Sequence, residues 1–136
     1  MVRHATAVWN GSGKEGKGHL TTASKALDKV SYNYRMRFEN DPGTNPEELV
    51  AAAHAGCFSM KLSFILGEAG FTPDSIETRS DVTLENGAIT KSHLTVTASV
   101  PGISKEKFDE CVQKAKETCP ISKSLSGQIS AEGRLQ

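Results

Sequence analysis

Hydrophobic and polar residues follow two different rhythms along this chain. Stretches in which they alternate predict β-strands, at residues 3–10, 19–24, 31–38, 76–84, 88–100 and 128–135. Stretches with apolar residues at helical spacing predict helices, over residues 46–70, 104–117 and 119–127. Strands therefore come in runs between helices, not in strict alternation with them. This order predicts an α+β fold with an antiparallel sheet instead of a doubly wound parallel one.

The long predicted helix has the clearest start signal in the chain. Asn45 is a good N-cap, Pro46 suits the first helical position, and two glutamates follow in the first turn. Apolar residues then occur on most sides of the helix, and residues 51–56 are mostly small. Such a helix is expected in the middle of a protein, with its backbone packed closely against a neighbour. Gly70 is a natural end for it.

Composition narrows the class of protein. With 136 residues, the chain is expected to form a single domain over residues 1–136. Sixteen basic residues balance sixteen acidic ones, which argues against nucleic acid or an anionic membrane surface as a partner. The hydrophobic content of 37% is low for a self-sufficient monomer of this size. We therefore expect part of the core to be shared in an oligomer.

The chain carries neither a membrane-span pattern nor a secretion pattern. No window approaches ~18 consecutive apolar residues, so no membrane span is predicted. The first residues lack the apolar stretch of a signal peptide, so the expected compartment is the cytoplasm. In that compartment, three cysteines argue against a structural disulfide framework and leave redox, metal-binding or buried-thiol roles.

Two of the cysteines stand in settings that can make a thiol reactive. Cys119 precedes Pro120, which favours the first position of a helix, and a thiol there feels the positive end of the helix dipole. Cys57 lies about three turns into the long helix, where the dipole gives little help, so its activation needs a nearby cation. Cys111 falls on the inward stripe of its helix and is interpreted as core. If the fold brings Cys57 and Cys119 together, the chain has an attacking and a resolving thiol.

Each candidate also has a purely structural interpretation. Cys57 can be a small buried core thiol, and Cys119 can be an N-cap without function. Arg37 ends a predicted strand, and Glu47 lies in the first turn of the long helix. The two can be unrelated surface residues, or Glu47 can hold Arg37 in a bidentate pair that aims the guanidinium at a thiolate or a peroxide oxygen.

His54 lies three residues before Cys57 and therefore on the same helix face. It is open to three interpretations: a packed histidine, a general base for a nucleophilic Cys57, or a metal ligand together with Cys57 and Cys119. No Cys-x-x-Cys or His-x-x-x-His pair supports the third of these. The sequence therefore predicts no metal site.

Several segments resemble a known family. The most specific surround the two candidate cysteines: Asn-Pro-Glu-Glu-Leu at 45–49, Ala-Ala-His-Ala-Gly-Cys-Phe-Ser-Met at 52–60, and Ala-Lys-Glu-Thr-Cys-Pro-Ile-Ser at 115–122. Residues 36–39, 66–73 and 100–103 fit the same pattern. Together they resemble the OsmC/Ohr family of thiol peroxidases, and within it the OsmC branch of osmotically inducible proteins. The resemblance covers nearly the whole chain.

The resemblance implies an enzyme, a thiol-dependent peroxidase that acts in oxidative and osmotic stress defence. Its substrates would be organic hydroperoxides and, more weakly, hydrogen peroxide, which it reduces to alcohols and water. By the same resemblance, Cys57 attacks the peroxide and Cys119 resolves the sulfenic acid as a Cys57–Cys119 disulfide. Arg37 and Glu47 match the activating pair of the family, with the adjacent Glu48 as an alternative partner for the arginine.

The resemblance also implies an intertwined homodimer, with antiparallel sheets wrapped around long central helices and residues of both chains in each active site. No prosthetic cofactor is implied, and the reductant would be an external dithiol of lipoyl type or another small dithiol. Two alternatives stay open: a non-enzymatic stress-related binding or structural dimer with incidental thiols, and a cysteine hydrolase that uses Cys57 and His54.

The expected substrate preference follows from aromatic and apolar residues near the catalytic positions. An apolar approach to Cys57 would favour alkyl or aryl hydroperoxides over hydrogen peroxide. The candidates for this lining are Phe38, Phe58, Met60 and Phe64, of which Phe64 is better interpreted as core.

Overall fold

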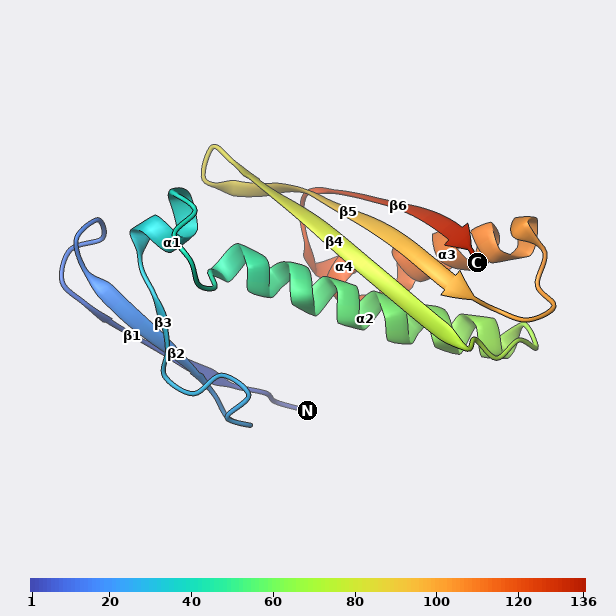
Figure 1. The fold of residues 1–136 in the computed structure, drawn as a ribbon, viewed down its shortest axis with the longest axis horizontal. Coiled ribbons are helices and arrows are strands. Elements are labelled where there is room, and N and C mark those ends of the chain that lie inside the picture. Colours follow the sequence, from blue (N-terminus) through green and yellow to red (C-terminus); the bar gives the residue numbers. More distant parts are fainter. The chain divides into compact units, whose positions relative to one another are not determined.

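The structure is a computed structural model that describes residues 1–136 (Figure 1). The chain forms two compact units, Met1–Leu49 and Val50–Gln136. The first unit contains a three-stranded sheet in the order β1-β2-β3, and both strand pairs are antiparallel. Its elements are β1 (Ala5–Asn10), β2 (Lys17–Thr22), β3 (Val30–Tyr32) and the short helix α1 (Tyr34–Phe38).

The strand predicted over residues 31–38 is wrong after Tyr32. The chain leaves the sheet after Tyr32 and turns into α1. Asn33 explains the change, because its side-chain oxygen accepts a hydrogen bond of 2.9 Å from the backbone N–H of Met36 and so caps the helix. The aromatic residues of this stretch favour a strand by propensity, but the cap decides the local structure. As a result, Arg37 lies on a helix and not on a strand.

The long helix α2 (Pro46–Glu68) begins as the sequence predicts. The side chain of Asn45 accepts a hydrogen bond of 2.8 Å from the backbone N–H of Glu48. The chain turns away after the helix at Gly70, whose φ of +91° suits glycine. By length and composition alone α2 is able to cross a membrane, which is weak evidence because the core helix of a soluble protein meets the same test.

The second unit places helices against one three-stranded sheet in the order β4-β5-β6 (Figure 1). Besides most of α2, it contains β4 (Ser75–Glu85), β5 (Ala88–Ser99), α3 (Lys105–Thr118), α4 (Pro120–Ser124) and β6 (Gln128–Leu135). The hairpin between β4 and β5 turns at Asn86 and Gly87, which both have positive φ, as a two-residue hairpin turn of this Asn-Gly type requires.

One strand pairing in the second unit differs from the antiparallel prediction. β4 and β5 are antiparallel, but β6 pairs with β5 in parallel. The helices α3 and α4 lie between β5 and β6 in the sequence and return the chain to the end of the sheet where β5 begins. Such a crossover makes the two strands it joins run in the same direction. The α+β class is correct, and the second sheet is mixed.

The core of the second unit lies between the sheet and the helices. Alternate residues of β5 are fully buried, and they meet apolar side chains of α2 and α3. The largest contributors are Phe58, Leu62, Leu66, Leu94, Val96, Phe108 and Val112. The opposite face of α2 is uncovered in the single chain, where Met60 and Phe64 are 66% and 65% exposed. The apolar composition of α2 predicted burial on most sides, but within the single chain the helix is buried along one face only.

Candidate active site

The fold brings Cys57 and Cys119 into contact. The two sulfur atoms are 3.1 Å apart, although the residues are separated by 62 positions in the sequence. Both thiols are free, Cys57 is half-buried, and Cys119 is fully buried. The Cys119 thiol donates a hydrogen bond to the sulfur of Cys57. This contact is the geometry that an attacking and a resolving thiol need.

The position of Cys119 follows from the junction between two helices. Its backbone N–H closes α3 on the carbonyl of Ala115, and its carbonyl accepts from the N–H of Lys123 in α4. Pro120 occupies the first turn of α4, as predicted. The Cys119 side chain makes no capping hydrogen bond. The thiol is therefore directed to Cys57 and does not serve as an ordinary N-cap.

The surroundings of Cys57 within its own unit do not favour the thiolate. Burial raises the pKa of Cys57 most, and the neighbouring Cys119 thiol adds to the rise. The backbone N–H of Ile121 and the charge of Lys61 lower the pKa of Cys57, but they do not reverse the shift. The predicted need for a further cation at this thiol therefore stands.

Arg37 and Glu47 form an ion pair within the first unit. The guanidinium Nε and Nη2 groups both donate to Oε1 of Glu47, the first at 2.8 Å. Glu48 instead accepts from the hydroxyl of Thr44, so the partner of Arg37 is Glu47. The pairing differs from the expected bidentate one, because both N–H groups share one oxygen and the buried Oε2 has no partner. The hydrogen bonds that Arg37 donates to Glu47 raise the pKa of Arg37 and keep it charged.

A pocket of about 260 Å³ opens beside Arg37 within the same unit. Two aromatic pairs contribute to its wall, Trp9 with Tyr32 and Tyr34 with Phe38. The guanidinium carbon of Arg37 lies 5.0 Å from the centroid of the Phe38 ring. Of the lining predicted from the sequence, only Phe38 contributes here. Trp9, Tyr32 and Tyr34 were not predicted in this lining, although Tyr32 and Tyr34 lie close to Phe38 in the sequence.

The remaining predicted lining residues have other environments. Phe58 is fully buried in the core of the second unit, so it cannot contact a substrate. Met60 and Phe64 lie on the exposed face of α2, where they line a shallow groove with Gly67. The interpretation of Phe64 as core is wrong for the single chain.

His54 is a fully buried histidine with both ring nitrogens occupied. Nδ1 forms a hydrogen bond of 2.6 Å with the Ser92 hydroxyl, and Nε2 forms one of 2.7 Å with the Ser122 hydroxyl. Burial lowers the pKa of His54, which keeps the ring neutral. With both nitrogens engaged by serines, the ring is available neither to deprotonate Cys57 nor to bind a metal beside it. Of the three interpretations, the packed histidine agrees with these contacts.

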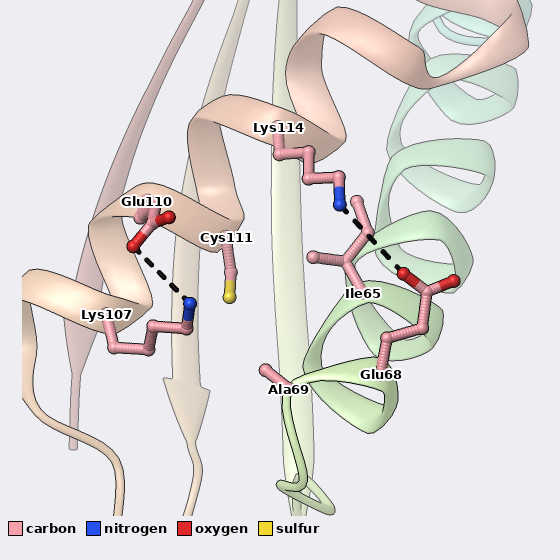
Figure 2. A pocket seen from close by; sticks show the side chains of 7 residues that line it. All are labelled: Ile65, Glu68, Ala69, Lys107, Glu110, Cys111 and Lys114. Atoms are coloured by element: carbon pink, nitrogen blue, oxygen red, sulfur yellow. Dashed lines mark hydrogen bonds and ion pairs between the residues drawn. The ribbon is translucent and has the colours of Figure 1, made fainter.

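Cys111 lies in a different environment from the other two cysteines. It is 3% exposed and belongs to the core, as predicted. Figure 2 shows its thiol at a pocket bounded by two ion pairs, Lys107 with Glu110 and Lys114 with Glu68. Burial is the main reason why the pKa of Cys111 is raised. This thiol has no sulfur partner.

The fold and the site together define a class: an α+β protein with a reduced pair of cysteines in contact. Within this class, the sequence model of the family described as OsmC-like protein matches residues 38–132, and the chain belongs to that family. This membership confirms the resemblance that the motifs indicate.

The relatives agree with the family assignment. The chain is 49% identical to the Escherichia coli (strain K12) protein named peroxiredoxin OsmC, over 96% of this chain and 94% of the relative. It is 32% identical to the Bacillus subtilis (strain 168) organic hydroperoxide resistance protein OhrB, over 88% and 89% of the two chains.

Solved structures agree with the α+β fold. The crystal structure of Bacillus subtilis OhrB matches with a TM-score of 0.65 and 27% identity, over 98% of each chain. An OsmC-like protein of Vibrio cholerae matches with a TM-score of 0.75 over 98% of this chain and 99% of its own. At 16% identity, this second match concerns the fold alone.

Proposed function

We propose that this protein is a cysteine-based peroxidase that reduces organic hydroperoxides through Cys57 and Cys119. The observation that carries the proposal is the 3.1 Å contact between the two reduced sulfurs. The names of the relatives, a peroxiredoxin and an organic hydroperoxide resistance protein, support the same chemistry. We assign the whole chain, residues 1–136, to one functional domain.

In the first step, the Cys57 thiolate attacks the distal oxygen of the hydroperoxide. The O–O bond breaks, the sulfur becomes a sulfenic acid, and the alkoxide leaves as an alcohol after it takes up a proton. In the second step, the Cys119 thiol displaces hydroxide from that sulfur, a disulfide forms, and water leaves. An external dithiol then reduces the disulfide by exchange and restores both thiols.

The attack on the peroxide requires a cation near Cys57, because burial raises the pKa of its thiol. In this proposal the guanidinium of Arg37, held by Glu47, is the cation that activates Cys57. It favours the thiolate and stabilises the negative charge that develops on the leaving oxygen. The aromatic wall beside Arg37 would receive the organic part of the hydroperoxide.

The partner in the assembled enzyme is a second copy of the chain. The exposed face of α2 carries Met60 and Phe64 beside Gly56, Ser63 and Gly67, an apolar surface with small residues that allow two helices to approach closely. A homodimer with α2 at its centre would bury this face and complete the core that composition suggested to be shared. Sedimentation of the wild type and of Phe64→Lys tests the dimer, since a charge at this position should shift the equilibrium to monomer. An unchanged dimer would contradict the proposed interface.

The remaining components are proposed on chemical grounds. Two thiols and an external dithiol account for every electron in the cycle, so the protein needs no prosthetic group. We propose the cytoplasm as its compartment, where dithiol reductants maintain thiols in the reduced state.

Stopped-flow kinetics with cumene hydroperoxide and an excess of dithiol tests the proposal. We expect the wild type and Cys111→Ser to consume the peroxide at similar rates. Cys57→Ser should lose at least about 10³-fold, because the nucleophile is gone. If the wild type consumes the peroxide no faster than Cys57→Ser, the protein is not a peroxidase, and a passive dimer with incidental thiols describes it better.

A further inference from the structure

A series of hydrogen-bonded polar side chains, of which His54, Ser92 and Ser122 are buried, connects several elements around α2. It starts at the partly buried Ser80 in β4, whose hydroxyl lies 3.0 Å from that of Ser92 in β5. Ser92 binds one nitrogen of His54, and the other nitrogen binds Ser122 in α4. A neutral imidazole donates from one nitrogen and accepts at the other, and hydroxyls do either, so every link is satisfied. These hydrogen bonds therefore connect β4 and β5, α2 and α4 through the imidazole of His54.

Two contacts join α2 to the segment after α3, His54 with Ser122 and Cys57 with Cys119, and the residues are three positions apart on both sides. His54 and Cys57 lie three residues apart and therefore on one face of α2. Cys119 and Ser122 are also three residues apart. The contact of His54 with Ser122 thus stands beside the contact of Cys57 with Cys119.

The short helix α4 has few other attachments to the core. Ser122 is its only buried residue, and Ile121 packs against the core from a partly exposed position. Pro120, Lys123 and Ser124 are exposed. The position of α4 matters for Cys57 in two ways, because this segment follows the resolving thiol and because the N–H of Ile121 acts on the Cys57 sulfur.

We infer that His54 is a positioning residue, which through Ser122 holds Cys119 in place to attack the oxidised Cys57. The inference rests on the proposed peroxidase function and adds a residue that takes no part in the bond changes. In the step concerned, the S–O bond of the Cys57 sulfenic acid breaks, the S–S bond forms, and hydroxide leaves with the Cys119 proton as water. When the tie is lost, Cys119 spends less time within reach of Cys57, and a second peroxide oxidises the waiting sulfenic acid to sulfinic acid.

Timed trapping of the oxidised protein tests this inference. Reduced protein is mixed with one equivalent of cumene hydroperoxide and quenched at intervals with dimedone and N-ethylmaleimide. Mass spectrometry then measures the sulfenic acid, disulfide and sulfinic acid at Cys57. We expect Ser122→Ala to form the sulfenic acid but to close the disulfide at least about tenfold more slowly, because small misplacements of reacting groups are costly. The sulfinic acid should increase when more peroxide is added.

The matched control is Ser124→Ala, which removes a hydroxyl from the same short helix. Ser124 bonds only to the carbonyl of Pro120 and has no tie to His54, so this variant should resolve like the wild type. Ser122→Thr restores the hydroxyl and should restore the rate, which a general loss of stability would not explain. If Ser122→Ala does not fold, Ser92→Ala releases the same imidazole from β5, and slower closure than in Ser124→Ala is again expected.

Equal closure rates in the folded Ser122 or Ser92 variant and in Ser124→Ala would overturn the inference and leave the peroxidase proposal intact. A wild type that yields neither sulfenic acid nor disulfide would overturn the proposed function itself, and the positioning role with it.

Discussion

Cys119 and Cys111 lie eight residues apart at α3 and have almost the same exposure, yet their neighbours differ completely. Cys119 is fully buried with the sulfur of Cys57 at 3.1 Å. Cys111 is 3% exposed and belongs to the apolar core, and its thiol lies at a pocket that carries two lysine–glutamate pairs but no second sulfur (Figure 2). Burial alone therefore does not separate a reactive thiol from a structural one. The neighbouring groups do.

The pair of Cys57 and Cys119 lacks, within its own surroundings, a group that lowers the pKa of Cys57 below its ordinary value. Burial is the main cause that raises the pKa of Cys57, and it does the same for Cys111. A nucleophilic thiol needs the opposite shift. We therefore propose that two neighbours distinguish Cys57 from Cys111: the cation Arg37 and the second sulfur of Cys119.

Among variants that retain the attacking Cys57, the largest expected effect comes from removal of the resolving sulfur. Cys119→Ser should consume the first equivalent of cumene hydroperoxide at the wild-type rate and then slow sharply, because Cys57 cannot close its disulfide. We expect turnover with a dithiol to fall by at least about 100-fold, and a second equivalent of peroxide to convert the sulfenic acid on Cys57 to sulfinic acid. Stopped-flow and mass spectrometry measure both. Cys111→Ser should retain turnover, and an equal loss in that variant would remove the distinction between the two buried thiols.

A smaller effect is expected when the cation is removed. Arg37→Ala should displace the pH profile of Cys57 alkylation to higher pH and slow alkylation at pH 7 on the order of tenfold, because less thiolate is present. Iodoacetamide labelling with site-resolved mass spectrometry measures the profile, and Cys111 in the same sample serves as the control. Arg37→Lys keeps a charge but not the paired N–H groups, so an intermediate profile is expected. An unchanged profile in Arg37→Ala would remove Arg37 from the activation of Cys57.

The smallest expected effect concerns stability and pH. Burial lowers the pKa of His54 in the folded protein, so the unfolded chain binds a proton there that the folded chain does not. The stabilisation is fully present above the unfolded pKa of about 6.5 and is lost as the pH falls through the lower folded pKa. Urea unfolding between pH 7.5 and 5 should show this decline. His54→Gln should show a shallower decline. Identical slopes in the two proteins would contradict the claim that the buried His54 causes this pH dependence of stability.

Much of the fold was predictable because its signals are local. The cap at Asn45, the turn at Asn86-Gly87 and the cap at Ser104 each depend on a few adjacent residues, and the structure contains all three. The helix α1 was missed because Asn33 was not interpreted as a cap within an aromatic stretch that favours a strand. The parallel pairing of β6 was missed because it depends on where α3 and α4 return the chain, which local patterns do not specify.

The candidate site was predictable to a different degree. The motifs around Cys57 and Cys119 drew attention to two residues that the fold does bring together. The family resemblance favoured Glu47 as the partner of Arg37 and left Glu48 as an alternative, and only the contacts of Arg37 with Glu47 and of Thr44 with Glu48 decide between them. The link from His54 to Ser92 and Ser122 joins positions 38 and 68 residues away, and no spacing rule connects them.

The central claim is that Cys57 and Cys119, and not Cys111, carry the redox chemistry of the protein. Mass spectrometry of protein treated with one equivalent of cumene hydroperoxide and digested without reductant tests it most directly. The account predicts a crosslink between the peptides that contain Cys57 and Cys119, with Cys111 recovered as a free thiol. A crosslink that includes Cys111, or full recovery of free Cys57 and Cys119 after the peroxide has been added, would contradict it.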